Sequence, residues 1–422
     1  MSEKTLIVLM EGRRMGVVTQ KNNRMRFEYD DTWAVDDTPL SLSMPPAIRQ
    51  HSHTAIACFM WGLLTDNEET LSAIGREHHV SPRNPFALLS VVGHDCAGAV
   101  QFVRPEDLET VQHGGGIEPI SDEDIEAELR SLRVRRGGGK ANATFSLAGA
   151  QPKVAYTRIK GRWFQPSGRM ATTHILKPSS DSHDGLIENE HFCLQLANRI
   201  GWPLVAATSE IGKFGDETAI ISTRYDRAVD DTDTLVVDRI HQEDMCQALT
   251  FRPGLKYEKD GGPGIARIMR VISGSNSPEV DRDRFMRCVI FNFVIKGTDA
   301  HAKNYSVIHI GDQYRLAPFY DIASILPYSE FDPHELKSSM RIGKHYKFND
   351  IMPRHWEETA KAALYNADKV MSDISYLIRI LPDHAHNLAK DTIESGLDHP
   401  IISKLTDEIE KRCLALRRVY QG

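Results

Sequence analysis

The chain has 422 residues, of which 41% are hydrophobic and 26% charged, and its formal net charge is −7. This composition is ordinary for a globular protein, and the length predicts two or three lobes rather than one core. The negative charge excludes a general attraction to polyanions, so we do not expect the chain to bind nucleic acid by itself.

The cysteines and the first residues indicate the compartment. The six cysteines form no Cys-x-x-Cys pair, which argues against a disulfide framework or a zinc site and favours a reducing compartment. The apolar run Leu6–Met10 is only five residues long, which predicts a first strand rather than a signal peptide. No apolar stretch reaches the roughly 18 to 20 residues of a membrane span. We therefore expect a cytoplasmic protein with no membrane partner.

Three regions with different patterns follow one another along the chain. Residues 1–110 predict short strands with one helix near residues 55–66. Residues 111–235 predict a helix that starts near Ser121 and runs to Arg136, then further strands and a helix over residues 188–200. Residues 236–422 predict helices, except for one hairpin. We expect three domains with these boundaries, two of them rich in strands and the last one helical.

A run of small residues, Ser146–Lys153, precedes a predicted strand that begins near Val154. Small side chains allow backbone N–H groups to approach an anionic ligand closely, as they do in loops that bind phosphate. The run is not a Walker sequence. An ordinary hairpin with a tight turn is an equally good interpretation of this segment alone.

A lysine near the end of a strand and a carboxylate on the following helix form a second pattern. Thr173–Pro178 predicts a strand that carries Lys177, and Glu188 and Glu190 open the next predicted helix. In kinases an ion pair of this kind positions the phosphates of ATP. The sequence does not fix the rotation of this helix, so it does not show whether Glu190 or Glu188 pairs with Lys177. The alternative is a surface lysine and an acidic first turn that favours the helix dipole.

The most informative pattern is acidic and amide residues at a fixed spacing. The apolar stretch Phe285–Ile295 predicts a buried helix, and Asp299 follows it. Asn304 lies five residues after Asp299, and Asp321 lies seventeen residues after Asn304, past a predicted hairpin over residues 305–316. This spacing is typical of kinase-like folds, in which such residues provide a catalytic base and two magnesium ligands. The alternative for an isolated match is that these residues cap turns.

Five segments in this order resemble the HipA family, whose members are serine/threonine kinases that serve as toxins of bacterial toxin–antitoxin modules. They are Ser146–Lys153, Arg224–Arg227, Gln242–Gln247, Thr298–Asn304 and Phe319–Ile322. The resemblance implies an α+β, bilobal, protein-kinase-like fold with a β-rich N-terminal lobe and a mostly helical C-terminal lobe. Residues 111–235 would then be the nucleotide-binding part of the N-terminal lobe.

The resemblance also implies roles for single residues, with ATP and Mg²⁺ as cofactors. Asp299 would be the catalytic base, Asn304 and Asp321 the magnesium ligands, and Lys177 a contact of the ATP phosphates. Thr223 stands where a glutamate is common in the family, in the strand that would read the adenine edge. The rest of the implied nucleotide site comprises Ser146, Leu147, Ala148, Gly149, Ala150, Gln151, Lys153, Thr223, Arg224, Tyr225, Gln242 and His301.

The family further implies regulation and partners. Ser146 would be phosphorylated, and a group that carries about −1.5 to −2 charges would displace a loop that otherwise holds ATP phosphates, turning the kinase off. The implied partner is a small, dimeric helix-turn-helix antitoxin that holds the toxin on operator DNA. The implied substrate is a protein of translation such as an aminoacyl-tRNA synthetase. A catalytically weak ATP-binding co-repressor scaffold and a small-molecule kinase remain as alternatives.

Overall fold

The computed structural model describes residues 3–134, 148–180, 183–200, 204–230 and 236–421. Two compact units share the chain, and each is built from several segments. The first unit comprises Met1–Pro178, Gly212–Gly254 and Val307–Tyr314, and the second comprises Ser179–Ile211, Leu255–Ser306 and Arg315–Gly422. The three-domain division expected from the sequence stays a prediction.

The first unit begins with a five-stranded sheet and its helices. The strands are β1 (Lys4–Met10), β2 (Arg13–Lys21), β3 (Arg24–Tyr29), β4 (Gln50–His51) and β5 (Val100–Val103), in the order β4-β3-β2-β1-β5. The helical segments are α1 (His53–Leu63), α2 (Glu68–Glu77), α3 (Pro85–Val92), η1 (Pro105–Asp107) and α4 (Leu108–His113). The helix predicted near residues 55–66 is confirmed as α1.

Strand β1 explains why this part of the chain starts with a continuous apolar run. Its neighbours β2 and β5 pair with both of its edges, and successive side chains point to opposite faces. Val8 packs into a core that contains Phe27 and Phe59, whereas Leu9 packs into a smaller cluster with Val111. Because both faces are covered, the strand is apolar throughout rather than alternating.

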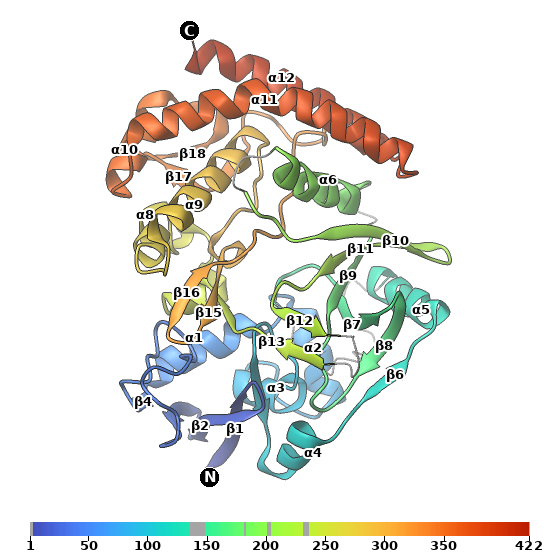
Figure 1. Cartoon of the computed structure of the whole chain (residues 1–422), viewed down its shortest axis with the longest axis vertical. Helices are drawn as coiled ribbons and strands as arrows, with labels where there is room; N and C mark the ends of the chain where they lie inside the picture. The colour runs from blue at the N-terminus through green and yellow to red at the C-terminus, as the bar shows by residue number, and fades with distance from the viewer. Residues whose placement is uncertain (1–2, 135–147, 181–182, 201–203, 231–235, 422) are drawn as a thin grey trace. The chain divides into compact units, whose positions relative to one another are not determined.

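A six-stranded sheet follows in the order β10-β11-β9-β7-β8-β6. Its strands are β6 (Ile117–Pro119), β7 (Val154–Ile159), β8 (Arg162–Pro166), β9 (His174–Pro178), β10 (Ser209–Phe214) and β11 (Glu217–Thr223). Helix α5 (Asp122–Val134) covers this sheet, and its fully buried Ile125 and Leu129 lie one turn apart (Figure 1). Lys177 therefore lies on an inner strand, between β11 and β7.

Several short elements lie between residues 227 and 316. Strands β12 (Arg227–Asp230) and β13 (Val236–Arg239) form a ribbon, and β14 (Gln242–Asp244), β15 (Ser306–Ile310) and β16 (Gln313–Leu316) form a three-stranded sheet. The helical segments here are α7 (Met245–Ala248) and η2 (Pro253–Leu255). The predicted hairpin after Asn304 is confirmed as β15 and β16, and Gly311 turns between them with φ +61°.

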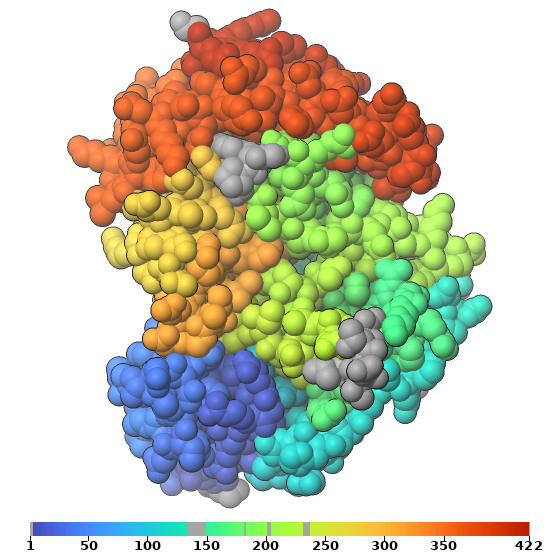
Figure 2. Space-filling model, in the orientation of Figure 1, coloured from blue at the N-terminus to red at the C-terminus, as the bar shows by residue number. Residues whose placement is uncertain are grey.

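The second unit is mostly helical. Its helices are α6 (Leu186–Arg199), α8 (Ile265–Ile272), α9 (Pro278–Val294), α10 (Pro353–Ala362), α11 (Ala367–Glu394) and α12 (Pro400–Tyr420), with 3₁₀ segments η3 (Glu258–Asp260), η4 (Ala302–Asn304) and η5 (Phe348–Asp350). Helices α11 and α12 lie side by side (Figure 1) and present a continuous outer surface (Figure 2). No helix among the described residues is long and apolar enough to cross a membrane. All six cysteines are buried free thiols.

One expectation for the C-terminal region was wrong. The sequence predicted helices with a single hairpin after Gln242, but β14 is also a strand, and β17 (Lys337–Ile342) pairs with β18 (His345–Lys347). Strands β14 and β18 have three residues each, and β17 does not alternate strictly, because its adjacent residues Ser339 and Met340 are both buried. These strands therefore lack a reliable period of two, and their pairing partners supply the backbone hydrogen bonds that stabilise them.

Candidate active site

The buried helix α9 directly precedes the loop of the candidate site. Its last turn is followed by Lys296 in the left-handed region, with φ +51°, and by Gly297, whose N–H donates to the Asn292 carbonyl over 2.7 Å. A Cβ at Gly297 would lie 2.2 Å from Oδ1 of Asn292, so only glycine fits this turn without movement of its neighbour. The turn ends the helix and starts the loop that carries Asp299.

Local hydrogen bonds shape that loop. The Asp299 carbonyl accepts from the N–H of His301 over 2.8 Å and from Nδ2 of Asn304 over 2.7 Å. The Asn304 side chain is buried and fixed by this bond, which leaves its Oδ1 as the amide atom that can face a cation. In contrast, the Asp299 side chain is 66% exposed. The loop thus presents a carboxylate to solvent and holds the buried Asn304 side chain in a fixed orientation.

Tyr320 joins the segment of Asp321 to this loop. Its hydroxyl donates to the Lys303 carbonyl over 2.7 Å and lies 2.6 Å from Oγ of Ser306. The neighbours of Asn304 and Asp321 in sequence are therefore in direct contact, as the hairpin between them predicts.

A second set of bonds joins the two segments on the other side of Asp321. Oγ of Ser324 donates to the Ile295 carbonyl over 2.5 Å, and the N–H of Ile325 donates to the Lys296 carbonyl over 3.3 Å. Asp321 lies between these bonds and those of Tyr320. The segment that contains Asp321 thus runs antiparallel to the loop of Asp299 and is hydrogen-bonded to that part of the chain on both sides of Asp321.

The backbone at Asp321 is in an uncommon conformation. Its φ is +53°, in the left-handed region that residues other than glycine adopt uncommonly, although aspartate adopts it more often than most. Such a conformation costs of order 1 kcal/mol and persists only where the surrounding structure enforces it. Here the flanking bonds of Tyr320 and Ser324 enforce it, and the conformation sets the direction of the carboxylate.

The oxygen donors of Asn304 and Asp321 fit a hard cation. Magnesium prefers carboxylate and carbonyl oxygens and usually completes its shell with water and phosphate oxygens, so one carboxylate and one amide oxygen are a reasonable protein contribution. In the described part of the chain, no group of three or more His, Cys, Asp or Glu side chains is placed to hold a metal ion.

Two aromatic side chains flank Asp299. Nε2 of His301 lies 3.7 Å from Oδ1 of Asp299. The pKa of this histidine is lowered, mainly because the ring is buried, and the neutral ring is therefore favoured at pH 7. The hydroxyl of Tyr257 donates to the same Oδ1 over 2.7 Å. The sequence analysis missed Tyr257, because it precedes Asp299 by 42 residues and belongs to none of the motifs.

The small-residue segment lies in the first unit, and Ser146 and Leu147 fall outside the described residues. Gly149 has φ +105°, and its carbonyl accepts from Oγ1 of Thr65 over 2.8 Å and from the N–H of Asp66 over 3.1 Å. Nζ of Lys153 donates to the Ala148 carbonyl over 2.6 Å. The end of this segment is thus anchored, while Ala150 and Gln151 are exposed.

Lys177 is buried on β9, where it pairs with Ile220 of β11. Glu188 and Glu190 are both buried in the first turns of α6, so their burial does not distinguish them. The choice of partner for Lys177 stays open.

The end of β11 carries the residues expected to read adenine. Thr223 is exposed, and the N–H of Arg224 donates to the Thr173 carbonyl over 2.9 Å, which extends the pairing with β9 by one residue. The hydroxyl of Tyr225 donates to Oε1 of Gln242. Two of the predicted nucleotide contacts, Tyr225 and Gln242, are therefore adjacent, and each helps to fix the other.

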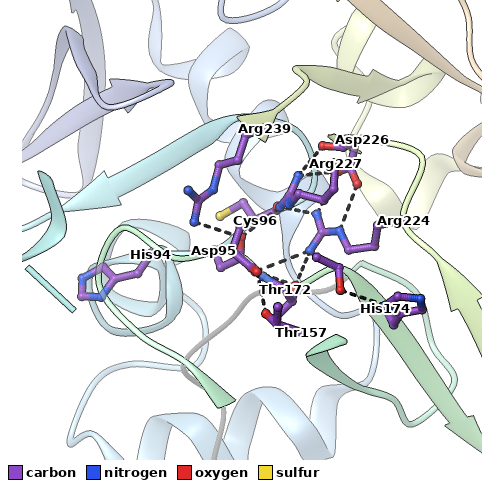
Figure 3. Close-up of polar contacts among 12 residues, drawn as sticks. His94, Asp95, Cys96, Thr157, Thr172, His174, Arg224, Asp226, Arg227 and Arg239 are labelled. Carbon is purple, nitrogen blue, oxygen red and sulfur yellow. Dashed lines mark hydrogen bonds and ion pairs between the residues drawn. The ribbon is translucent and has the colours of Figure 1, made fainter. Parts of the chain in front are cut away.

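The side chain of Arg224 belongs to a buried ionic cluster that the sequence analysis missed (Figure 3). Arg224 donates to both oxygens of Asp226 over 2.8 and 2.9 Å, and Arg227 donates to Asp95 over 2.9 Å. Burial alone would raise the pKa of Asp95, but Arg227, Arg224 and Arg239 outweigh it and lower the pKa to about 2. The cluster connects the loop before β5 to the end of β11, so only the backbone of Arg224 is available to a nucleotide.

Comparisons with known proteins agree with this architecture. The family model described as the HipA N-terminal domain matches residues 6–103, and the HipA-like C-terminal domain matches residues 145–390. The chain is 34% identical over 99% of both sequences to a protein of Sinorhizobium fredii named "Putative kinase Y4mE". It is 28% identical to the "Serine/threonine-protein kinase toxin HipA" of Shewanella oneidensis, over 76% of this chain and 74% of the toxin.

A solved structure shows the same fold. It is the complex of HipA, HipB and operator DNA from Shewanella oneidensis, and the match has a TM-score of 0.85 at 22% identity over 99% of each chain. The α+β kinase-like fold predicted from the sequence is confirmed, and the protein is a kinase. The chain belongs to the HipA family. Its relatives, being kinases, imply that it uses ATP.

Proposed function

We propose that this protein is a serine/threonine protein kinase that depends on ATP and Mg²⁺ and acts as the toxin of a HipBA-like toxin–antitoxin module. Its substrate would be a protein of translation such as an aminoacyl-tRNA synthetase. Phosphorylation of Ser146 would inactivate it. The relatives' names support the kinase class, and the geometry around Asp299 supports the chemistry.

The proposed roles follow from the atoms at the site. Asp299 orients the attacking hydroxyl and accepts its proton, because its carboxylate is exposed at the end of a fixed loop. Asn304 and Asp321 would hold magnesium, which neutralises charge on the transferring phosphoryl group when it is bound. We assign ATP phosphate contacts to Lys177 and the segment Ser146–Lys153. We assign adenine contacts to the backbone of Thr223 and Arg224 and the side chains of Tyr225 and Gln242, with His301 beside the nucleotide.

One observation carries the proposal. The loop of Asp299 and the segment of Asp321 are hydrogen-bonded to each other on both sides of Asp321, by Tyr320 and by Ser324. Asp299 and Asn304 on one loop, and Asp321 seventeen residues after Asn304, are thereby held in one region of one unit. In the proposed roles, this arrangement would give the base and the two cation ligands common access to a phosphoryl group.

Labelled ATP tests the activity. We expect the purified chain, incubated with γ-labelled ATP and magnesium, to transfer label to itself or to an added protein. Asp299→Asn, Asn304→Ala and Asp321→Ala should each abolish transfer, whereas circular dichroism spectra should remain those of the folded protein. Binding of ATP without transfer would show a co-repressor scaffold instead, and label found only on a metabolite would show a small-molecule kinase.

Ser146 provides the proposed off switch. A phosphorylated serine would place a dianion in a segment proposed to bind ATP phosphates, and the like charges would repel. Ser146→Ala should therefore keep its activity after preincubation with ATP, while the wild type loses it. Equal loss in both proteins would show that Ser146 is not the switch.

The proposed partner is a small, dimeric helix-turn-helix antitoxin, through which the kinase would be held on operator DNA. The Shewanella HipA structure, which has the same fold, contains HipB and operator DNA. The net charge of −7 gives this chain little attraction for DNA by itself, so DNA retention should require the antitoxin. Gel-shift measurements with and without the product of a neighbouring reading frame test this. Phosphoproteomes after induction of the wild type and of Asp299→Asn would identify the targets.

A further inference from the structure

A second segment runs beside the loop of Asp299 in the same unit. The Lys256 carbonyl accepts from the N–H of Ala302 over 3.2 Å. The next residue, Tyr257, donates from its hydroxyl to Oδ1 of Asp299 over 2.7 Å, and its ring packs edge-on against His301 with centroids 5.0 Å apart. The two segments thus touch through backbone, through a polar side chain and through aromatic rings.

The segment of Tyr257 is itself firmly held. The Glu258 carboxylate accepts from the N–H of Arg341 over 2.8 Å and pairs with its Nε over 2.9 Å. Gly262 closes the turn by donating from its N–H to the Tyr257 carbonyl over 3.1 Å, and a Cβ at this position would lie 1.9 Å from the Leu255 carbonyl oxygen. Tyr257 is therefore carried on a turn with little freedom, which gives its hydroxyl a defined position.

The Tyr257 hydroxyl and the His301 ring both lie near the same carboxylate oxygen of Asp299. Oδ1 accepts from Tyr257 and lies 3.7 Å from Nε2 of His301. Within the described residues, Oδ2 accepts no hydrogen bond, and the side chain is mostly exposed. One oxygen of the carboxylate is thus occupied by the protein, and the other faces solvent.

We propose that Tyr257 is a positioning residue for phosphoryl transfer. Its hydroxyl holds Oδ1 so that Oδ2 of Asp299 meets the acceptor hydroxyl of a serine or threonine. In the step, the acceptor oxygen forms a bond to the γ-phosphorus and its proton goes to Oδ2. The bond to the bridging oxygen breaks, and its electron pair leaves with ADP. Tyr257 keeps its own proton throughout.

This inference rests on the proposed function, because it assumes that Asp299 is the base. A fixed carboxylate raises the rate of the chemical step, since a freely rotating one spends less time in the reactive orientation. Tyr257 contacts neither ATP nor the acceptor in this assignment. Its loss should therefore change the maximal rate and leave nucleotide binding unaffected.

Tyr257→Phe removes the hydroxyl and keeps the ring against His301. We expect the rate of self-labelling at saturating ATP and magnesium to fall about tenfold, because a hydrogen bond to a charged group is lost. The ATP concentration at half-maximal rate, the affinity for ADP and the melting temperature should stay close to wild type.

Tyr365→Phe is the matched control. The Tyr365 hydroxyl donates to Oδ1 of Asp283 over 2.6 Å in the same unit, so this change also removes a tyrosine–aspartate hydrogen bond, but away from Asp299. We expect it to label at the wild-type rate. An equal loss of rate in both variants would overturn the proposal, because it would indicate a general effect on structure.

Two further outcomes would overturn it. An unchanged rate in Tyr257→Phe would show that the hydrogen bond has no role, and an increased rate would show that Tyr257 restrains the base instead. If the wild type does not label at all, the proposed function fails.

A second variant tests the same turn if Tyr257→Phe does not fold. Glu258→Gln loosens this turn without touching Asp299, so it should reduce the maximal rate and leave ADP affinity unchanged. A wild-type maximal rate in that variant would contradict the proposal.

Discussion

At the scale of single residues, the candidate site separates groups that perform chemistry from groups that hold them. Asp299 is exposed, whereas Asn304 and His301 beside it are buried. In the proposed function, the exposure of Asp299 would allow a protein substrate to reach it, and the burial of its neighbours fixes the loop that carries it. Asp321 is fixed in another way. Its backbone is held in an unfavourable conformation, and this conformation sets the direction of its carboxylate.

The conformation of Asp321 leads to a test that separates stability from activity. Asp321→Gly and Asp321→Ala should both be inactive, because both lack the carboxylate. The glycine variant should be more stable by about 1 kcal/mol, because glycine adopts φ +53° without the steric cost that alanine pays. Urea unfolding of the two variants measures the difference. Equal stability would show that position 321 is free to adopt another conformation.

The buried ionic cluster leads to a prediction about Asp95. Asp95→Asn would leave Arg224, Arg227 and Arg239 with one carboxylate fewer in a buried site, so we expect the free energy of unfolding to fall by about 3–5 kcal/mol. Asp37→Asn is the control, because Asp37 pairs with Arg13 at the surface.

The control change should cost less than about 1 kcal/mol. Denaturant titrations of both variants provide the measurement. A similar small effect at both positions would show that the cluster contributes nothing beyond a surface pair.

At the scale of elements, the turn after α9 sets where the loop of Asp299 begins. Gly297→Ala would place a Cβ 2.2 Å from Oδ1 of Asn292 and force this buried side chain to move. We expect a loss of stability of about 1–3 kcal/mol and a lower rate of self-labelling, since the loop of Asp299 starts at this turn. Gly254→Ala is the control, because a Cβ there meets nothing within 4 Å. Melting curves and labelling rates of the two variants should therefore differ.

Residues of the N-terminal region support the hairpin of β15 and β16, which follows the loop of Asp299. The Glu243 carboxylate of β14 accepts from Oγ of Ser41 over 2.5 Å and from the N–H of Leu42 over 2.7 Å, and Nε2 of His309 on β15 lies 3.0 Å from it. The residues that match the HipA N-terminal domain are therefore part of the support of this hairpin.

At the scale of the whole molecule, stability should depend on pH through buried histidines. Burial and the neighbouring His309 lower the pKa of His241 to about 3, although a hydrogen bond to the Leu40 carbonyl opposes the shift. The unfolded value is about 6.5. The folded state therefore resists protonation, so the stability contributed by neutral His241 is complete above about pH 6.5 and is lost as the pH falls toward 3.

Urea unfolding between pH 6.5 and 5 tests this dependence, above the range in which most aspartates gain protons. The wild type should lose up to about 1.4 kcal/mol per pH unit through this group, and His241→Gln should show a correspondingly shallower slope. His113→Gln, at an exposed position, should keep the wild-type slope. Parallel slopes in all three proteins would contradict the prediction.

The α+β fold, the hairpin after Asn304 and the position of α1 could be predicted from the sequence. Each depends on a local pattern: apolar periodicity, a turn with glycine, or the order of motifs along the chain. The spacing of Asp299, Asn304 and Asp321 likewise encodes a loop and a hairpin that return the chain to the same place. The roles of these residues, and of Ser146, stay predictions.

What the tertiary structure decided are the contacts between segments far apart in the chain. The bond from Tyr257 to Asp299, the buried cluster around Asp95 and the short pair β17 and β18 have no periodic signal, because their partners are separated by ten to more than a hundred residues or lie in very short strands. The sequence by itself determined the order of the chemical groups. Only packing determined which of them meet, because hydrogen-bond geometry and burial depend on the path of the folded chain.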